Sequence, residues 1–176
     1  AGSVDNYGNN HNPNDDFIEL KNFLNATVDF SGWSIKIYQQ GEPTISIVIP
    51  QGITIGTQET ITLGNNIDGA FSYLNIINPK FKLPNTPFVI KVKDGRSSTS
   101  DTVDFEGTGY IPAGVGYPTL RKSAIRRVTF FGPESGDLAY NWMTYATSRV
   151  STNVRSSYES TVLCSPGDEI PGEGFE

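Results

Sequence analysis

Apolar and polar residues alternate in short runs along much of the chain. In the run 17–23, Ile18 and Leu20 lie on one face of an extended segment, and the charged Glu19 lies on the other. No window repeats its apolar residues at the spacing of a helix, and clusters of Gly, Pro and Asn separate the runs. The pattern predicts an all-β chain with short strands at 17–23, 34–38, 44–49, 53–55, 60–63, 88–93 and 101–105.

The residues between these runs predict how the strands connect. A turn at Asp94-Gly95 predicts a hairpin of 88–93 with 101–105, and a Gly-Thr-Gln turn separates 53–55 from 60–63. Prolines within 65–87 exclude a continuous central strand there and indicate a long crossing connection. The simplest arrangement is an antiparallel β-sandwich. Its predicted core contains Ile18, Leu20, Trp33, Ile35, Ile37, Ile47, Ile61, Leu63, Val89, Val92 and Val103.

The composition fits one globular domain and excludes several kinds of metal site and an intrachain disulfide. The chain has 176 residues, a formal net charge of −6, one His and one Cys. His11 and Cys164 alone cannot form an HExxH helix, a Cys-rich zinc site or an intrachain disulfide. No apolar run approaches the length of a membrane span, so no membrane insertion is predicted. We predict a β-sandwich domain over 1–150 and a polar, acidic tail or linker, rich in Pro and Gly, over 151–176.

Basic residues gather in one stretch of this acidic chain. Arg121, Lys122, Arg126 and Arg127 are candidates for binding phosphate or acidic glycans, because guanidinium groups bind such anions through paired hydrogen bonds. The alternative is a solvated strand face that balances the acidic ends of the chain. The overall negative charge disfavours nucleic acid as the partner.

The amino-terminal segment is rich in oxygen donors. Asp5, Asp15 and Asp16, together with several asparagines, are the hard ligands that Ca²⁺ prefers. Their spacing does not match an EF-hand loop, and ordinary turn formation by Asn and Asp is the alternative. Calcium is therefore the one candidate cofactor. No catalytic residue is predicted, because isolated carboxylates such as Glu19 are usually solvated or paired.

Two motifs resemble those of a known family. Residues 16–22 read DFIELKN and residues 28–35 read VDFSGWSI. They resemble the opening of lamin-tail domains, which carry a Phe-Ile-Glu-Leu-x-Asn strand followed by an Asp-[Leu/Phe]-Ser-Gly-Trp turn. Residues 49–66 look like the next hairpin of the family, 88–105 like its strand and Asp-Gly turn unit, and 120–142 like its closing Arg-containing stretch. The resemblance covers about residues 3–146, with longer connections at 65–87 and 106–118.

The resemblance implies an immunoglobulin-like fold and a function in binding. Lamin-tail domains occur in nuclear lamins and as accessory modules of exported bacterial proteins, and the module is not known for catalysis. We expect a non-catalytic, secreted or cell-surface module, its signal peptide removed, that belongs to a larger protein and binds a protein or the cell surface. The alternative is an accessory domain that presents nucleic acid or acidic polysaccharide to an enzyme on the same polypeptide. A third hypothesis, an independent hydrolase, is supported only by scattered carboxylates.

Overall fold

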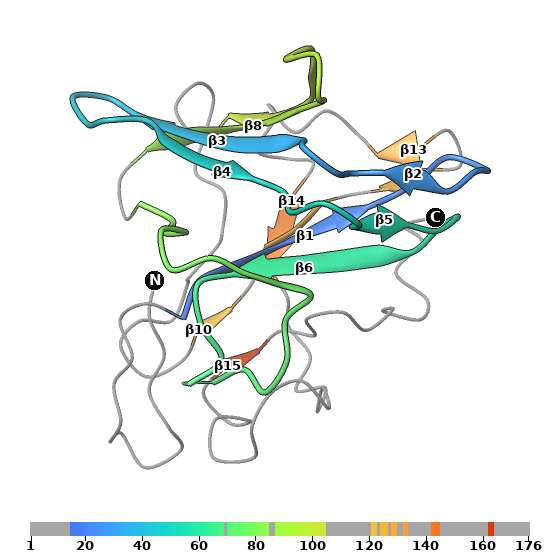
Figure 1. Ribbon diagram of the computed structural model, residues 1–176. Coiled ribbons are helices and arrows are strands. Elements are labelled where there is room, and N and C mark those ends of the chain that lie inside the picture. Colours follow the sequence, from blue (N-terminus) through green and yellow to red (C-terminus); the bar gives the residue numbers. More distant parts are fainter. Residues whose placement is uncertain are drawn as a thin grey trace.

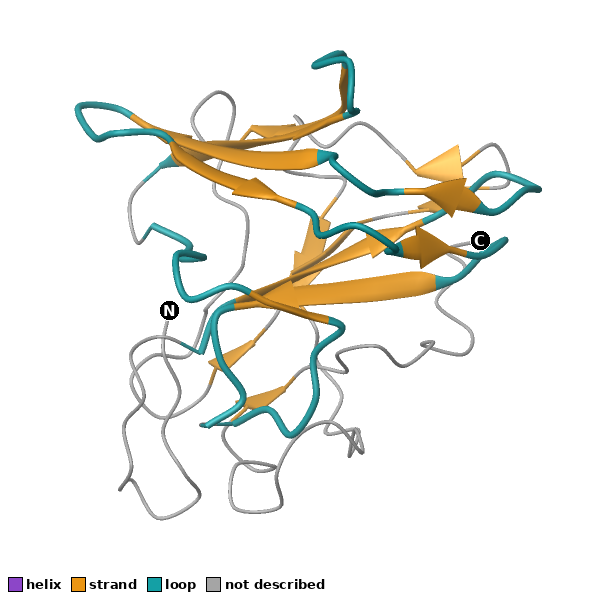
Figure 2. Cartoon of the chain, in the orientation of Figure 1, coloured by secondary structure: helices purple, strands orange, loops and turns teal. Residues whose placement is uncertain are grey.

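The computed structural model describes residues 15–68, 70–84 and 87–104, and beyond them the backbone of six short strands. Within these residues the chain is all-β and contains no helix, as predicted (Figure 2). None of the described segments therefore has the form of a long apolar membrane-spanning helix. The predicted boundary at residue 150 lies outside the described residues.

Two sheets build the sandwich (Figure 1). One has the order β1-β6-β7 and the other the order β4-β3-β8-β9. In sequence, β2 and β5, which pair with each other, each lie between a strand of one sheet and a strand of the other. Their bounds are β1 (Phe17–Lys21), β2 (Val28–Asp29), β3 (Ser34–Gln39), β4 (Ile45–Val48), β5 (Thr54–Ile55), β6 (Thr60–Gly64), β7 (Ile76–Ile77), β8 (Phe88–Lys93) and β9 (Thr99–Asp104).

The remaining strands form pairs of their own. β10 (Arg121–Lys122) pairs with β15 (Val162–Leu163) in parallel. β11 (Ala124–Arg126) and β14 (Trp142–Thr144) are antiparallel, as are β12 (Val128–Thr129) and β13 (Gly132–Pro133).

A single antiparallel ribbon connects the two sheets. Its first arm is β1-β2-β3 and its second arm is β4-β5-β6, and they pair as β1 with β6, β2 with β5, and β3 with β4. One end of the ribbon therefore belongs to the three-stranded sheet and the other to the four-stranded sheet. Figure 1 shows β2 and β5 at the side of the molecule, between these two ends. The ribbon must bend at two places to join sheets that face each other.

Asn22 holds the first bend, between the pairs β1-β6 and β2-β5. Its buried side-chain amide donates hydrogen bonds to the carbonyl oxygens of Ala26, Ile55 and Gly56 at 2.8, 3.0 and 2.9 Å. Its Oδ1 accepts the N–H of Leu24 at 2.9 Å. Regular pairing is interrupted here, so the Asn22 side chain satisfies backbone groups that would otherwise be buried without partners.

The second bend, between β2 and β3, is formed by residues 29–33. The carboxylate of Asp29 accepts the N–H of Ser31 at 2.8 Å, and Gly32 takes a φ of 75°, which favours glycine. The ring of Phe30 stacks on Trp33 with centroids 4.2 Å apart, and Trp33 packs against the core. This contact confirms Gly32-Trp33 as a turn followed by a core residue. The Ser31 hydroxyl accepts the N–H of Gly52 and so joins both arms.

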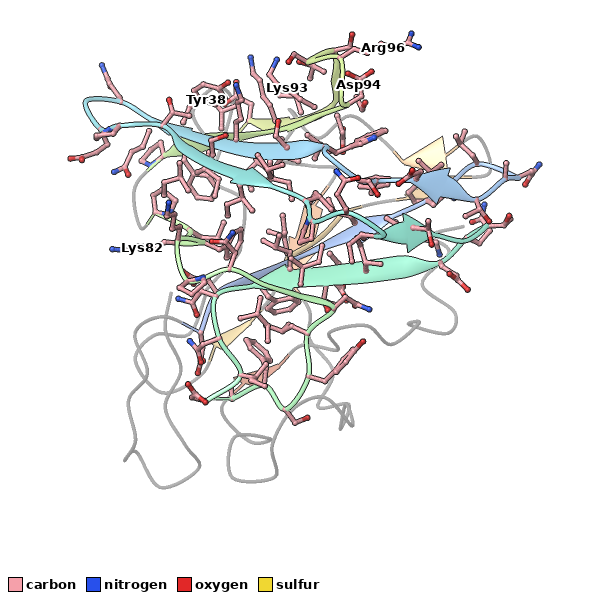
Figure 3. All side chains as sticks on the ribbon, viewed as in Figure 1. Tyr38, Lys82, Lys93, Asp94 and Arg96 are labelled. Atoms are coloured by element: carbon pink, nitrogen blue, oxygen red, sulfur yellow. The ribbon has the colours of Figure 1, made fainter. Side chains whose placement is uncertain are left out.

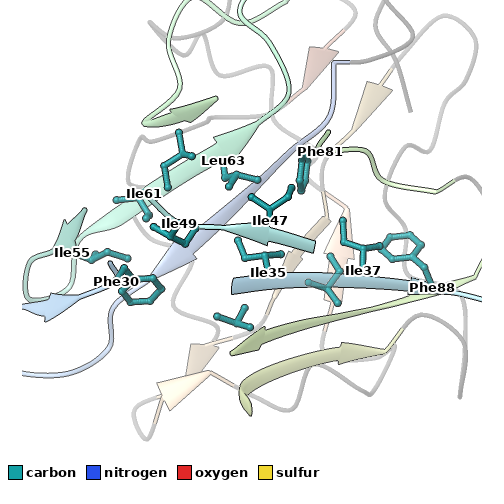
Figure 4. Packing of buried hydrophobic residues seen from close by; sticks show 13 residues of the cluster. Phe30, Ile35, Ile37, Ile47, Ile49, Ile55, Ile61, Leu63, Phe81 and Phe88 are labelled. Carbon is teal, nitrogen blue, oxygen red and sulfur yellow. The ribbon is translucent and has the colours of Figure 1, made fainter. Parts of the chain in front are cut away.

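The facing sides of the two sheets form one apolar core (Figure 4). Ile35, Ile37 and Ile47 come from the four-stranded sheet, and Ile61 and Leu63 from the three-stranded sheet. Burial of such side chains contributes about 1.5–3 kcal/mol each. The remaining buried members are Phe30, Ile49, Ile55, Ile76, Phe81, Phe88, Ile90 and Val92.

The connection between β6 and β8 covers part of the outer face of the three-stranded sheet, while Glu19 and Lys21 on that face stay exposed. Its residues Ala70, Phe71 and Leu74 form a second apolar cluster, and the Phe71 ring meets Phe17 of β1 at 5.0 Å. Gly64 permits this close approach, because an added Cβ would lie 2.6 Å from a methyl carbon of Leu74. The predicted long connection is confirmed, and it adds the short strand β7 to the sheet.

Two sequence predictions about strands are wrong. The hairpin that the resemblance implies at 49–66 is not formed between 53–55 and 60–63, because both segments belong to the second arm of the ribbon and pair with β2 and β1. Val89 is not in the core: it lies opposite Tyr38, while its neighbours Phe88 and Ile90 point inward. Val89 and Val92 are three positions apart, so a regular strand places them on opposite faces. The hairpin of β8 and β9 is confirmed.

Asn22→Asp tests the first bend. The substitution keeps the size of the side chain but faces three carbonyl oxygens with a carboxylate in place of an N–H donor. We expect the free energy of unfolding to fall by about 3 kcal/mol, measured by urea denaturation. The matched control Asn25→Asp alters an exposed residue of the same loop and should change it by less than about 0.5 kcal/mol. Equal losses in the two variants would contradict the role of Asn22.

Candidate binding surface

The outer face of the four-stranded sheet carries basic and polar side chains. The core residues Ile35 and Ile37 alternate along β3 with Ser34, Lys36 and Tyr38, which face outward. Residues that lie directly opposite each other in paired strands share a face of the sheet. The same face therefore also carries Ser46 and Val48 of β4, Val89, Lys91 and Lys93 of β8, and Thr99, Thr102 and Asp104 of β9. We call this surface the lysine face. Figure 3 shows Tyr38 and Lys93 on it.

Two lysines of this face lie directly opposite each other. Lys36 of β3 pairs with Lys91 of β8 in the antiparallel register. Side chains at such positions have Cβ atoms about 4.5–5.5 Å apart, and like charges there are destabilising. The ammonium group of Lys91 lies 5.6 Å from the centre of the Tyr38 ring, a cation–π contact that offsets part of the repulsion.

Lys93 extends the positive charge toward the hairpin turn. Its ammonium group donates to the Thr99 hydroxyl at 3.1 Å and to the Ser97 carbonyl at 3.3 Å. In the turn, the Asp94 carboxylate accepts the N–H groups of Arg96 and Ser98. Asp94 therefore stabilises the turn, while the side chain of Arg96 is exposed at the edge of the lysine face (Figure 3).

The lysine face is partly accessible to a partner, because Lys36, Tyr38, Lys91 and Lys93 are half-buried rather than covered. The connection 65–84 packs on the three-stranded sheet, whereas Val48 of β4 is 62% exposed and Ser46 is also exposed. The exposed Val48 lies opposite Ser34 on this face, so the surface offers both apolar and polar contacts.

Several polar side chains elsewhere bond both to the backbone and to one another. Thr62 and Asn75 bond reciprocally: Asn75 Oδ1 accepts the N–H and hydroxyl of Thr62, and the Thr62 hydroxyl accepts the N–H of Asn75. At the second bend, the hydroxyl and N–H of Ser31 lower the pKa of the exposed Asp29 carboxyl below its ordinary value. These contacts extend the strand pairing and stabilise turns.

Asp15 and Asp16, predicted as calcium ligands, are both buried. Asp15 Oδ2 accepts the N–H of Ala70 at 2.9 Å, and Asp16 Oδ2 accepts the N–H of Leu83 at 3.0 Å. They therefore attach the long connection to the start of β1. No group of three or more candidate metal ligands is found within the described part of the chain, and Asp5 lies outside it. Calcium binding stays a prediction.

Three of the four predicted basic residues lie on two short strands. Arg121 and Lys122 form β10, Arg126 ends β11, and Arg127 lies outside the described residues. β10 and β11 pair with different partners. Anion binding by these four residues stays a prediction.

The lysine face is the candidate site that the sequence analysis missed. The signal was present, because Lys36 and Tyr38 alternate with core isoleucines and Lys91 and Lys93 do the same in β8. Only the pairing of β3 with β8 brings them onto one surface.

Comparison with known proteins adds no assignment: no protein-family model matches the chain, and no curated protein matches it significantly.

Lys36→Glu tests the repulsion between the opposed lysines. The substitution converts a like-charge pair into an opposite-charge pair with Lys91. We expect the free energy of unfolding, measured by urea denaturation at low salt, to rise by about 0.5 kcal/mol. The control Lys82→Glu makes the same change of charge at an exposed residue of the long connection, where it relieves no opposed pair, and should not raise the stability. A loss of stability in Lys36→Glu would contradict the arrangement.

Proposed function

We propose that the chain is a non-catalytic binding module of the lamin-tail type, exported from a bacterial cell as part of a larger protein. In this proposal an immunoglobulin-like sandwich serves as a rigid support, and the lysine face binds a protein or the cell surface. The function lies in surface complementarity rather than in a reaction.

The observation that carries the proposal is the opposed pair Lys36 and Lys91 on a partly accessible sheet face. Like charges at directly opposite positions reduce stability, so folding alone does not favour this pair. Residues that reduce stability are typical of binding surfaces, where function and stability make opposing demands. A partner that carries negative charge would relieve the repulsion.

The positions of the motif residues support the lamin-tail assignment. Asn22, which ends the first motif, holds one bend of the ribbon, and Asp29 to Trp33 of the second motif form the other. Residues with such geometric roles are the ones that a family of sandwiches would share. The buried Asp15, Asp16 and Asn22 contact the backbone, which supports a structural rather than a catalytic use of these side chains.

Binding to intact cells tests the proposed function. We expect the fluorescently labelled full chain to sediment with cells of its source bacterium at low salt. Lys36→Glu should reduce the bound fraction several-fold, because two units of charge change at the centre of the lysine face. Lys82→Glu, which makes the same change of net charge elsewhere, should bind as the wild type does. Equal binding by all three proteins, or no binding by the wild type, would overturn the proposal.

A further inference from the structure

We infer that the ligand of the lysine face is an acidic polysaccharide, a linear polymer of sugars that carry carboxylate groups. This inference rests on the proposed function and names the chemistry of its partner. It assigns binding to Lys36, Lys91 and Lys93, which come from β3 and β8, and not to the basic residues at 121–127.

The positive charges of the face form a connected group. Lys36 and Lys91 lie opposite each other, and Lys93 lies two positions further along the same face of β8. Successive outward residues of a strand are about 6.5–7 Å apart, since each residue rises about 3.3 Å. Three cations at such separations match a polymer with one carboxylate on each sugar better than a single small anion. One carboxylate, Asp104, lies on the same face opposite Val89.

The groups around the lysines are suited to sugar rings. The hydroxyls of Ser34, Ser46 and Thr102 lie on this face and can exchange hydrogen bonds with sugar hydroxyls. Tyr38 and the exposed Val48 offer apolar surface to the C–H groups of a ring. The face thus offers positive charge, hydroxyl groups and apolar surface, which complement the carboxylates, hydroxyls and C–H groups of a polymer of uronic acids.

The total charge of the chain favours a polysaccharide over nucleic acid. Duplex DNA carries one negative charge for each ~1.7 Å of its axis, and its binding depends largely on a positive field. The formal net charge of −6 opposes the approach of so dense a polyanion. A polyuronate carries fewer charges along its length, so a local group of three lysines can bind it within an acidic protein.

Titration with defined polymers tests the inference. The probes are polygalacturonate and hyaluronan, with dextran as the neutral polymer and a single-stranded oligothymidylate as the nucleic acid. We expect the full chain to bind at least one polyuronate at low salt, more weakly as NaCl is raised, and to bind neither dextran nor the oligonucleotide comparably.

Matched variants connect that binding to the lysine face. Lys36→Glu should weaken polyuronate binding about tenfold, and Lys91→Met, which keeps an apolar stem, about fivefold. Lys82→Glu should bind as the wild type does. Lys36→Glu is expected to be at least as stable as the wild type, so its loss of binding cannot be attributed to unfolding.

The outcomes separate this inference from the proposed function. Failure of both polyuronates to bind, preferential binding of the oligonucleotide, or binding that Lys36→Glu leaves unchanged would overturn the polysaccharide assignment. If cells still retained the chain through Lys36 in those cases, the binding module itself would stand. If the wild-type chain bound neither cells nor polyuronate, both proposals would be overturned.

Discussion

The sandwich depends on one antiparallel ribbon that passes from the three-stranded sheet to the four-stranded sheet. Backbone pairing cannot continue unbroken through two bends, so side chains must replace it there. Asn22 does so at the first bend by donating to three carbonyl oxygens, and the Asp29 carboxylate orders the turn at the second. With the ends of the ribbon held in facing sheets, the isoleucines of β3 and β4 meet those of β5 and β6 in one core.

The inner and outer faces of the two sheets differ in what covers them and in the side chains they carry. The inner faces bury apolar side chains, and the outer face of the three-stranded sheet is partly covered by the long connection, which Asp15 and Asp16 bind at Ala70 and Leu83. The outer face of the four-stranded sheet carries opposed lysines that do not help folding. A rigid sheet holds them at fixed separations, which would lower the entropic cost of binding the proposed polymer.

The sequence predicts the strands better than it predicts their partners. Alternation of apolar and polar residues places β1, β3, β4 and β8 correctly, because one face of each strand is buried. It does not reveal that Asn22 bonds to Ile55, 33 residues away, since a single polar residue after a strand has no periodic signal. The predicted core includes Val89, although its alternation with the buried Phe88 and Ile90 places it on the outer face. The lysine face was missed for a related reason: it exists only in the register of β3 with β8.

The central claim is that the lysine face is where the chain binds its partner. Backbone amide shifts measured by NMR during titration with a short oligogalacturonate test it most directly. The account predicts that the shifts concentrate in 34–38, 89–93 and 99–102, with little change in β1, β6 or the Asn22 bend. Shifts concentrated at 121–127, or no shifts at saturating ligand, would contradict it.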